Sequence, residues 1–369
     1  MFHWLSPVAG VVLVALALLD VFLTVLYARI GTAFFTEALG SLLWKVFKAV
    51  APRVPRHRDK ILSFCGPVLL VVAVVTWVSA LIAGFALVAW PKLGTSIVSS
   101  EPTTPTPTGF SSAVYYAGSC LTTAFGGNLV PQTPVFRMMV AVQSAIGVSV
   151  LTLTLTYFLE VYNALLRRNT LAQSLHHATG GTGDAAEWLA GLGAGGDFTE
   201  ARGELAGVAS SVLNFFESQH LYPVLIYFRF REARYAISRK ATICFDTVTL
   251  VRTALDQQRY TGFVQSAPVT QLWNGSMQLM AMMSKVFLGR EHPPEARADT
   301  DAATEQRWRR RFHAAAERLR AAGIVTAADE QEAAGRYVAL RRQWQCYVTA
   351  FADYMQRAPE EADPCGGSA

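Results

Sequence analysis

Three long apolar stretches constrain this chain more than any other feature of its sequence. They run from Pro7 to Ala28, from Ile61 to Trp90 and from about Met138 to Leu159. A helix rises about 1.5 Å per residue, so each stretch is long enough to cross about 30 Å of hydrocarbon. The first stretch lacks a basic leading segment and carries Asp20 near its centre, which favours a retained span over a cleaved signal peptide. We therefore predict an all-α membrane protein with three transmembrane helices.

Basic residues are distributed unevenly between the segments that join these stretches. Residues 29–60 contain seven lysines and arginines and two acids, whereas residues 91–134 contain one lysine and one glutamate. Cytoplasmic loops are the ones that retain positive charge. We therefore expect a multi-pass protein of the inner (plasma) membrane, with the amino terminus outside and everything after Arg168 in the cytoplasm. The net charge of +5 then reflects topology and contact with membrane lipids, and gives no sign of nucleic-acid binding.

A shorter apolar segment with a glycine-containing return lies between the second and third stretches. Its first half, from Phe110 to Leu121, is too short to cross a bilayer, so we expect a re-entrant helix whose backbone is buried in protein or lines water. The arrangement resembles the pore module of the potassium-channel superfamily, of the bacterial two-transmembrane type, over about residues 61–165. Thr122-Thr123 match the threonine pair of this family, and Leu129-Val130-Pro131 match the exit of its filter. Gly147 matches the hinge glycine of its inner helix.

The resemblance implies a homotetramer around one pore, with a monovalent cation (K+ or Na+) as the permeant ion and no cofactor. Phe125 stands where the family has a glycine and Asn128 where it has an acid, so we expect altered selectivity. Keeping filter carbonyls aligned requires positive φ angles, which glycine tolerates and phenylalanine does not. In a register shifted by one residue, Ala124 replaces a glycine instead. The implied selectivity filter is Thr122, Thr123, Ala124, Phe125, Gly126, Gly127 and Asn128.

Two acids within or beside the spans have two interpretations each. A carboxylate in the bilayer must face protein or water, so Asp20 is either a gating acid or a packing acid that meets Thr76 or Trp77. Glu160, at the cytoplasmic end of the third stretch, either concentrates cations at the inner mouth of a pore or pairs with the Arg167-Arg168 sequence. The polar residues of the third stretch either line a cavity or bond neighbouring helices. They are Gln143, Ser144, Thr152 and Thr156.

Residues 32–49 have an apolar pair every four positions with polar residues between them, which predicts an amphipathic helix. We expect it to lie at the inner membrane interface or to pack against the cytoplasmic domain. The domains are then residues 1–60 (first span and amphipathic helix), 61–165 (pore module) and 166–369 (a cytoplasmic helical domain).

The last domain shows helix formers and a helix start at Asp184-x-x-Glu187. We predict a bundle of helices at residues 200–217, 221–239, 241–259, 268–288, 302–322 and 327–357. The basic run from Arg307 to Phe312 is typical of a solvated or lipid-facing surface.

No part of the sequence indicates catalysis. Gly191, Gly193 and Gly196 fit a GxGxxG spacing, but no strand precedes them, so we do not expect a nucleotide site. The histidines and five cysteines lack metal-ligand spacing. We predict a cation channel and no enzyme. The alternative is a non-conducting membrane sensor or scaffold that binds a ligand or partner through its cytoplasmic domain.

Overall fold

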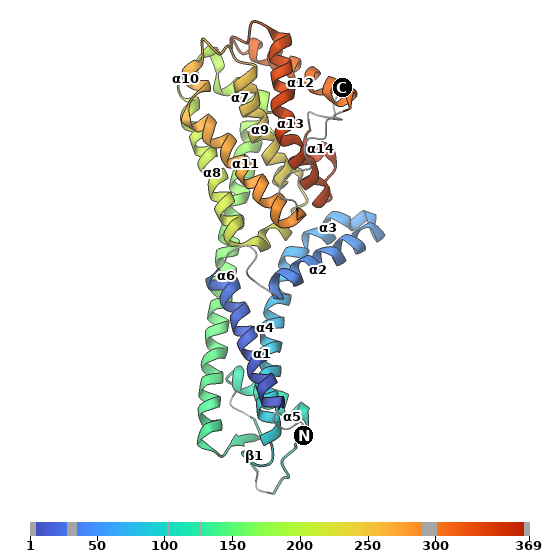
Figure 1. The fold of residues 1–369 in the computed structure, drawn as a ribbon, viewed down its shortest axis with the longest axis vertical. Helices are drawn as coiled ribbons and strands as arrows, with labels where there is room; N and C mark the ends of the chain where they lie inside the picture. The colour runs from blue at the N-terminus through green and yellow to red at the C-terminus, as the bar shows by residue number, and fades with distance from the viewer. Residues whose placement is uncertain (1–4, 28–34, 102, 125–126, 290–300, 365–369) are drawn as a thin grey trace. The chain divides into compact units, whose positions relative to one another are not determined.

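The computed structural model describes residues 5–27, 35–101, 103–124, 127–289 and 301–364 (Figure 1). It is mostly helical and divides into two compact units. The first contains residues up to 55, 64–162 and 222–227, and the second contains residues 56–63, 163–221 and those from 228 onward. Within the described part, the helices long and apolar enough to cross a membrane are Leu5–Leu26, Cys65–Lys92 and Pro134–Ala178. They confirm the prediction of a largely helical membrane protein with three spans.

In the first unit, α1 (Leu5–Val21) packs along α4 (Cys65–Ala89). Glycine allows their backbones to approach closely, because a Cβ atom on Gly10 would lie 2.4 Å from the carbonyl oxygen of Gly84. Ser6 adds a hydrogen bond from its hydroxyl to the Leu87 carbonyl, at 2.7 Å. A π-helical segment, Phe22–Leu26, continues α1. Small residues and apolar contact thus hold the two helices together.

The predicted amphipathic segment forms α2 (Phe35–Val50). One face of α2 is buried and carries Gly40 and Trp44, whose ring lies 6.1 Å from that of Tyr227. Another face carries exposed apolar side chains, Leu42 and Val46 among them. The helix is therefore present, and it has both a face packed on protein and an apolar face turned away from it.

Short elements lie between α4 and α6. α5 (Phe110–Leu121) is flanked by β1 (Ile97–Ser99) and β2 (Leu129–Pro131), which pair antiparallel with Val98 opposite Val130. α6 (Pro134–Ala178) continues 19 residues beyond Leu159, where the third apolar stretch was predicted to end. It contributes residues 134–162 to the first unit and 163–178 to the second.

The second unit is helical. α8 packs on α11, and α9 packs on both α13 and α11. Five of the six predicted helices are present with shifted ends, and the capped helix start at Asp184 is confirmed, because its side chain accepts a 2.8 Å hydrogen bond from the Ala186 amide. The elements are α3 (Arg58–Ser63), α7 (Ala185–Leu192), α8 (Ala201–Leu221), α9 (Ile237–Thr253), α10 (Thr261–Val264), α11 (Ala267–Leu288), α12 (Ala302–Ala321), α13 (Glu330–Tyr354) and α14 (Pro359–Ala362).

The helix predicted at residues 221–239 is wrong. After a 3₁₀ turn at Pro223–Tyr227 the chain is irregular as far as α9, apart from a second short turn. Arginine side chains here take the place of helical amides as donors to backbone carbonyls: Arg168 donates to Phe228, and Arg357 donates to Phe230. The segment satisfies its backbone through these long-range contacts, which local helix propensity does not reveal.

We expect Gly10→Ala to destabilise the first unit by about 1–3 kcal/mol, because the new methyl group overlaps the Gly84 carbonyl and α1 must shift. Thermal unfolding in detergent measures the change. Gly203→Ala on α8, where no atom lies within 4 Å, is the control and should be neutral or stabilising. Equal losses for the two variants would contradict the close packing of α1 on α4.

Candidate functional site

The predicted filter segment begins where α5 ends. Thr122, Thr123 and Ala124 are exposed, Gly127 is half-buried and Asn128 is exposed. Phe125 and Gly126, on which the expected change of selectivity depends, lie outside the described residues. The segment is anchored beyond them, because the Asn128 carbonyl accepts a 2.7 Å hydrogen bond from the Ser100 amide beside the β1–β2 pair.

Two side chains of α6 hold the carboxyl end of α5. Gln143 is fully buried and donates from Nε2 to the Ala117 carbonyl at 2.6 Å. One position further along α6, Ser144 donates to the Cys120 carbonyl at 2.9 Å. The Ser144 bond supplies a donor to a carbonyl at the end of α5, where intrahelical donors run out, and the Gln143 bond adds a donor three residues earlier. Of the two roles considered for these residues, the structure shows the bonding of neighbouring helices.

Gly147 lies one turn further along α6, directly against the end of α5. A Cβ atom at this position would lie 1.9 Å from the carbonyl oxygen of Leu121. No side chain fits in that space, so glycine is required by close packing. The resemblance implied a hinge at Gly147, and α6 is continuous through it in this structure.

The backbone turns sharply at Thr123. Its φ angle is 55°, in the left-handed region that disfavours a β-branched residue by about 1–2 kcal/mol. The turn is closed by the Ala124 amide, which donates to the Ser119 carbonyl at 3.0 Å. From the sequence, positive φ angles were predicted in this segment, with the strain at Phe125. In the described part the strained residue is Thr123.

Two hollows adjoin the end of α5. One is an open depression of about 740 Å³ lined by residues of α4 and α5 and by Thr122 and Ala124. The other is a cavity of about 220 Å³, lined mainly by aliphatic side chains of α4 and α6 and by Thr122, Thr123 and Gly147. The carboxyl end of a helix carries partial negative charge. The exposed segment after α5 therefore lies at the electronegative end of a helix, beside open space.

Asp20 is buried, and three groups of the described part of the chain donate hydrogen bonds to it. Trp77 of α4 donates from its indole nitrogen at 2.7 Å, and α2 donates from the Phe35 amide at 2.9 Å and the Thr36 hydroxyl at 3.1 Å. The contact with Trp77 that was considered for a packing acid is thus present. Asp20 joins α1, α2 and α4, and a gating role for it stays a prediction.

Two further polar residues of α6 form hydrogen bonds within their own helix. Thr152 and Thr156 are exposed and donate to carbonyls of their own helix, at 3.0 and 3.1 Å. Glu160 is also exposed. Its proposed place at an inner mouth stays a prediction.

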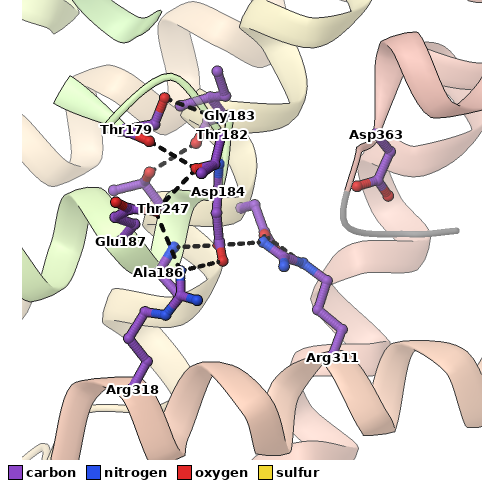
Figure 2. A network of polar contacts seen from close by, with 12 residues as sticks. Thr179, Thr182, Gly183, Asp184, Ala186, Glu187, Thr247, Arg311, Arg318 and Asp363 are labelled. Carbon is purple, nitrogen blue, oxygen red and sulfur yellow. Dashed lines mark hydrogen bonds and ion pairs between the residues drawn. The ribbon is translucent and has the colours of Figure 1, made fainter. Parts of the chain in front are cut away.

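The second unit contains a network of ion pairs and polar contacts that extends from buried to exposed residues (Figure 2). Asp246 of α9 is fully buried, accepts from Arg311 Nε at 3.0 Å and from the Tyr337 hydroxyl at 2.6 Å, and lies 3.6 Å from Arg341. Asp184, the cap of α7, also pairs with Arg311, at 3.0 Å. The further ion pairs are Arg318 with Asp184 and Glu187, and Arg341 with Asp363. Each carboxylate in the network has an arginine partner, so it ties α7, α9, α12 and α13 together.

Arg311 corrects part of the prediction for the basic run on α12. The run was predicted to face solvent or lipid, but Arg311 points into the second unit and Phe312 is buried. Sequence spacing gives no sign of the network, because Asp184, Asp246 and Arg341 are far apart in the chain. The only local signal was the helix start at Asp184.

The electrostatics of Asp246 indicate a structural role. Burial alone would raise the pKa of this carboxyl, but Arg311 and Arg341 outweigh burial and hold the pKa below its usual value. Asp246 is therefore ionised at neutral pH and fully paired. Such a group stabilises the fold and offers no free proton or ligand position.

Comparison with known proteins supports a membrane protein and no particular activity. No protein-family model matches the chain, and no solved structure matches it. The chain is similar to the uncharacterized membrane protein YdjJ of Bacillus subtilis (strain 168), with 24% identity over 261 residues. The matched region covers 68% of this chain and 71% of that protein. This similarity agrees with the three apolar helices.

We expect Gly147→Ala to separate the end of α5 from α6, since the added methyl group overlaps the Leu121 carbonyl. The loss of stability should be about 1–3 kcal/mol in thermal unfolding. Gly335→Ala, at an open position on α13, is the matched control and should show no loss. An unchanged unfolding temperature for Gly147→Ala would show that the two helices do not meet as described.

Asp246→Asn should cost about 3–5 kcal/mol at neutral pH, because it removes the negative charge that Arg311 and Arg341 share. The folded pKa of Asp246 is lowered, so its contribution is present above pH of about 4 and is lost as pH falls through the folded value. Unfolding measured from pH 7 to pH 3 should therefore be less pH-dependent in the variant. Glu217→Gln, an exposed acid of α8, is the control. If the unfolding free energy of Asp246→Asn depends on pH as steeply as that of the wild type, Asp246 is not the ion-paired acid described here.

Proposed function

We propose that the first unit supplies one quarter of a cation pore, formed by four copies of this chain in the membrane. The observation that carries the proposal is the geometry at the end of α5. A short helix directs its electronegative end at the exposed segment Thr122–Ala124, and Gln143 and Gly147 of the neighbouring long helix fix it there. A cation is stabilised at such a helix end, and more strongly when several are directed at one point.

The length of α5 supports a re-entrant position. Twelve residues of helix span about 18 Å, which is less than the roughly 30 Å of the hydrocarbon core. Irregular backbone is tolerated at membrane depth only where protein covers it or where it lines water. α6 supplies side-chain donors to the carboxyl end of α5, and the chain after it is exposed in a single copy. That exposed backbone needs either water in a pore or a neighbouring chain.

An exposed apolar stripe on α6 supports association between copies. In a single chain α6 is the least buried of the three long apolar helices. Its large side chains turned outward include Val135, Met138, Val142, Val148, Leu151, Leu155 and Leu159. Lipid and neighbouring copies would share this surface. Cyclic fourfold symmetry would bring four copies of Thr122–Ala124 around one axis, as the resemblance to the potassium-channel pore module implies.

We propose K+ or Na+ as the permeant ion, with selectivity that differs from that of a potassium channel. Phe125 and Asn128 replace a glycine and an acid of the family pattern. The left-handed backbone at Thr123 shows that this chain places strain where the family keeps a threonine. The distribution of basic residues supports an inner-membrane protein with the second unit in the cytoplasm.

Reconstitution of the full chain in planar bilayers tests conduction. We expect single-channel currents carried by monovalent cations, with weak discrimination between K+ and Na+. Phe125→Gly should raise the K+ to Na+ permeability ratio, because glycine at this position permits the carbonyl alignment that phenylalanine hinders. Phe22→Leu, an exposed position on the first apolar helix, is the control and should leave the ratio unchanged.

Absence of current under all voltages, pH values and lipid mixtures, for both the wild type and Phe125→Gly, would defeat the channel proposal. That outcome would favour the alternative, a non-conducting membrane sensor or scaffold whose helical second unit binds a partner.

A further inference from the structure

Lys240 is buried in the second unit among three helices. It lies in the first turns of α9 with 3% of its surface exposed. Its ammonium nitrogen lies 4.8 Å from the centre of the Phe215 ring of α8 and 3.5 Å from the Arg168 carbonyl oxygen of α6. The carbonyl is at the outer limit of a hydrogen bond. A buried lysine normally requires a close acid, and these contacts do not supply one.

The groups that act on Lys240 leave it without a negative partner. Among the residues that the structure describes, those whose charge affects it are Arg168 of α6 and Cys244 of α9, while α8 presents the uncharged Phe215 ring. Burial raises the pKa of the Cys244 thiol to about 12, so the thiol is neutral at ordinary pH. Arg168 keeps a charged guanidinium, as arginine does in proteins.

Two buried cations thus compete for one site. Burial, and then the charge of Arg168, lower the pKa of Lys240 well below its usual value. Arg168 keeps its proton and donates to the Phe228 carbonyl at 2.6 Å. The less costly arrangement is a charged Arg168 beside an uncharged Lys240.

We propose that Lys240 is a proton-responsive contact, uncharged while α8 and α9 pack against α6, and that proton uptake by Lys240 loosens this packing. The protonated side chain would place a second positive charge beside Arg168, and no acid of the described residues acts on Lys240 to balance that charge. Moving the ammonium group to water relieves that repulsion, and the helices around it must separate for it to do so.

The direction of the pH effect follows from the two states. When the contact opens, Lys240 has its ordinary pKa of about 10.4 and takes up a proton that the packed form does not hold. The packing therefore weakens as pH falls from about 10, by up to about tenfold in its equilibrium constant per pH unit, until the pKa of the packed form is reached. Below that value no further change is expected.

Helix α6 connects this contact to the first unit by chain continuity, since it also carries Gln143 and Gly147. An effect of Lys240 on conduction rests on the proposed function. Proton uptake by Lys240 does not rest on the proposed function, so either proposal can be disproved without the other.

Hydrogen–deuterium exchange of the full-length protein in lipid nanodiscs tests the proposal. Peptides from α8 and α9 are followed from pH 6 to pH 9.5, with each rate corrected for the intrinsic effect of pH on exchange. In the wild type we expect protection of these peptides to fall as pH falls. Lys240→Met, an uncharged side chain of similar length, should remove this dependence. Lys60→Met, at an exposed lysine, should keep it.

Parallel pH profiles in the wild type and Lys240→Met would overturn the proposal. A second result would also overturn it. If added chloride or phosphate, at fixed pH and ionic strength, raises the protection of the wild type and not that of Lys240→Met, then a bound anion balances a charged lysine. If Lys240→Met does not fold, the wild-type profile still tests the proposal. Corrected protection of the α8 and α9 peptides that does not change from pH 6 to pH 9.5 would exclude proton uptake when these helices separate.

Discussion

The position of the whole predicted filter segment depends on the contact between the end of α5 and α6. Gln143 and Ser144 donate to carbonyls at the carboxyl end of α5, and Gly147 lets the Leu121 carbonyl approach α6 without a side chain between them. The β1–β2 pair anchors the other side of the segment. The contact at the end of α5 lies directly before the left-handed turn at Thr123, and it supports the strained backbone there.

The features that the sequence predicted are those with a local physical cause. Apolar runs of sufficient length indicated the three spans, a four-residue apolar period indicated α2, and Asp184 indicated the start of α7. Each depends on residues that are neighbours in the chain. The irregular segment after Pro223 was missed because arginines far away in sequence, Arg168 and Arg357, satisfy its carbonyls.

The candidate site divides in the same way. Motif matching located Thr122–Asn128 and Gly147, but it did not show that Gly147 is required by close packing or that Gln143 bonds the Ala117 carbonyl. The network around Asp246 has no motif, because its members come from four helices, the loop before α7 and the end of α14. Asp20 was assigned two roles from its depth in a span, and only the folded chain shows that Trp77, Phe35 and Thr36 donate to it.

Two buried charges in the second unit have opposite surroundings. Asp246 lies between arginines that keep it ionised, and its helices are held together by that pairing. Lys240, six residues earlier on α9, has an arginine beside it, and no acid of the described residues acts on it, so its burial is compatible only with an uncharged amine or a counter-ion. Helix α9 therefore carries an ionised acid that is paired with arginines, Asp246, and a lysine that we propose is uncharged while the helices are packed, Lys240.

A density map of the purified full-length protein in nanodiscs tests the central proposal most directly, that four copies direct the ends of α5 at one axis. The account predicts a fourfold ring in which Thr122–Ala124 of each chain face that axis, with ion density along it and α6 beside each α5. A monomer or dimer, or a tetramer in which these segments face lipid, would contradict it.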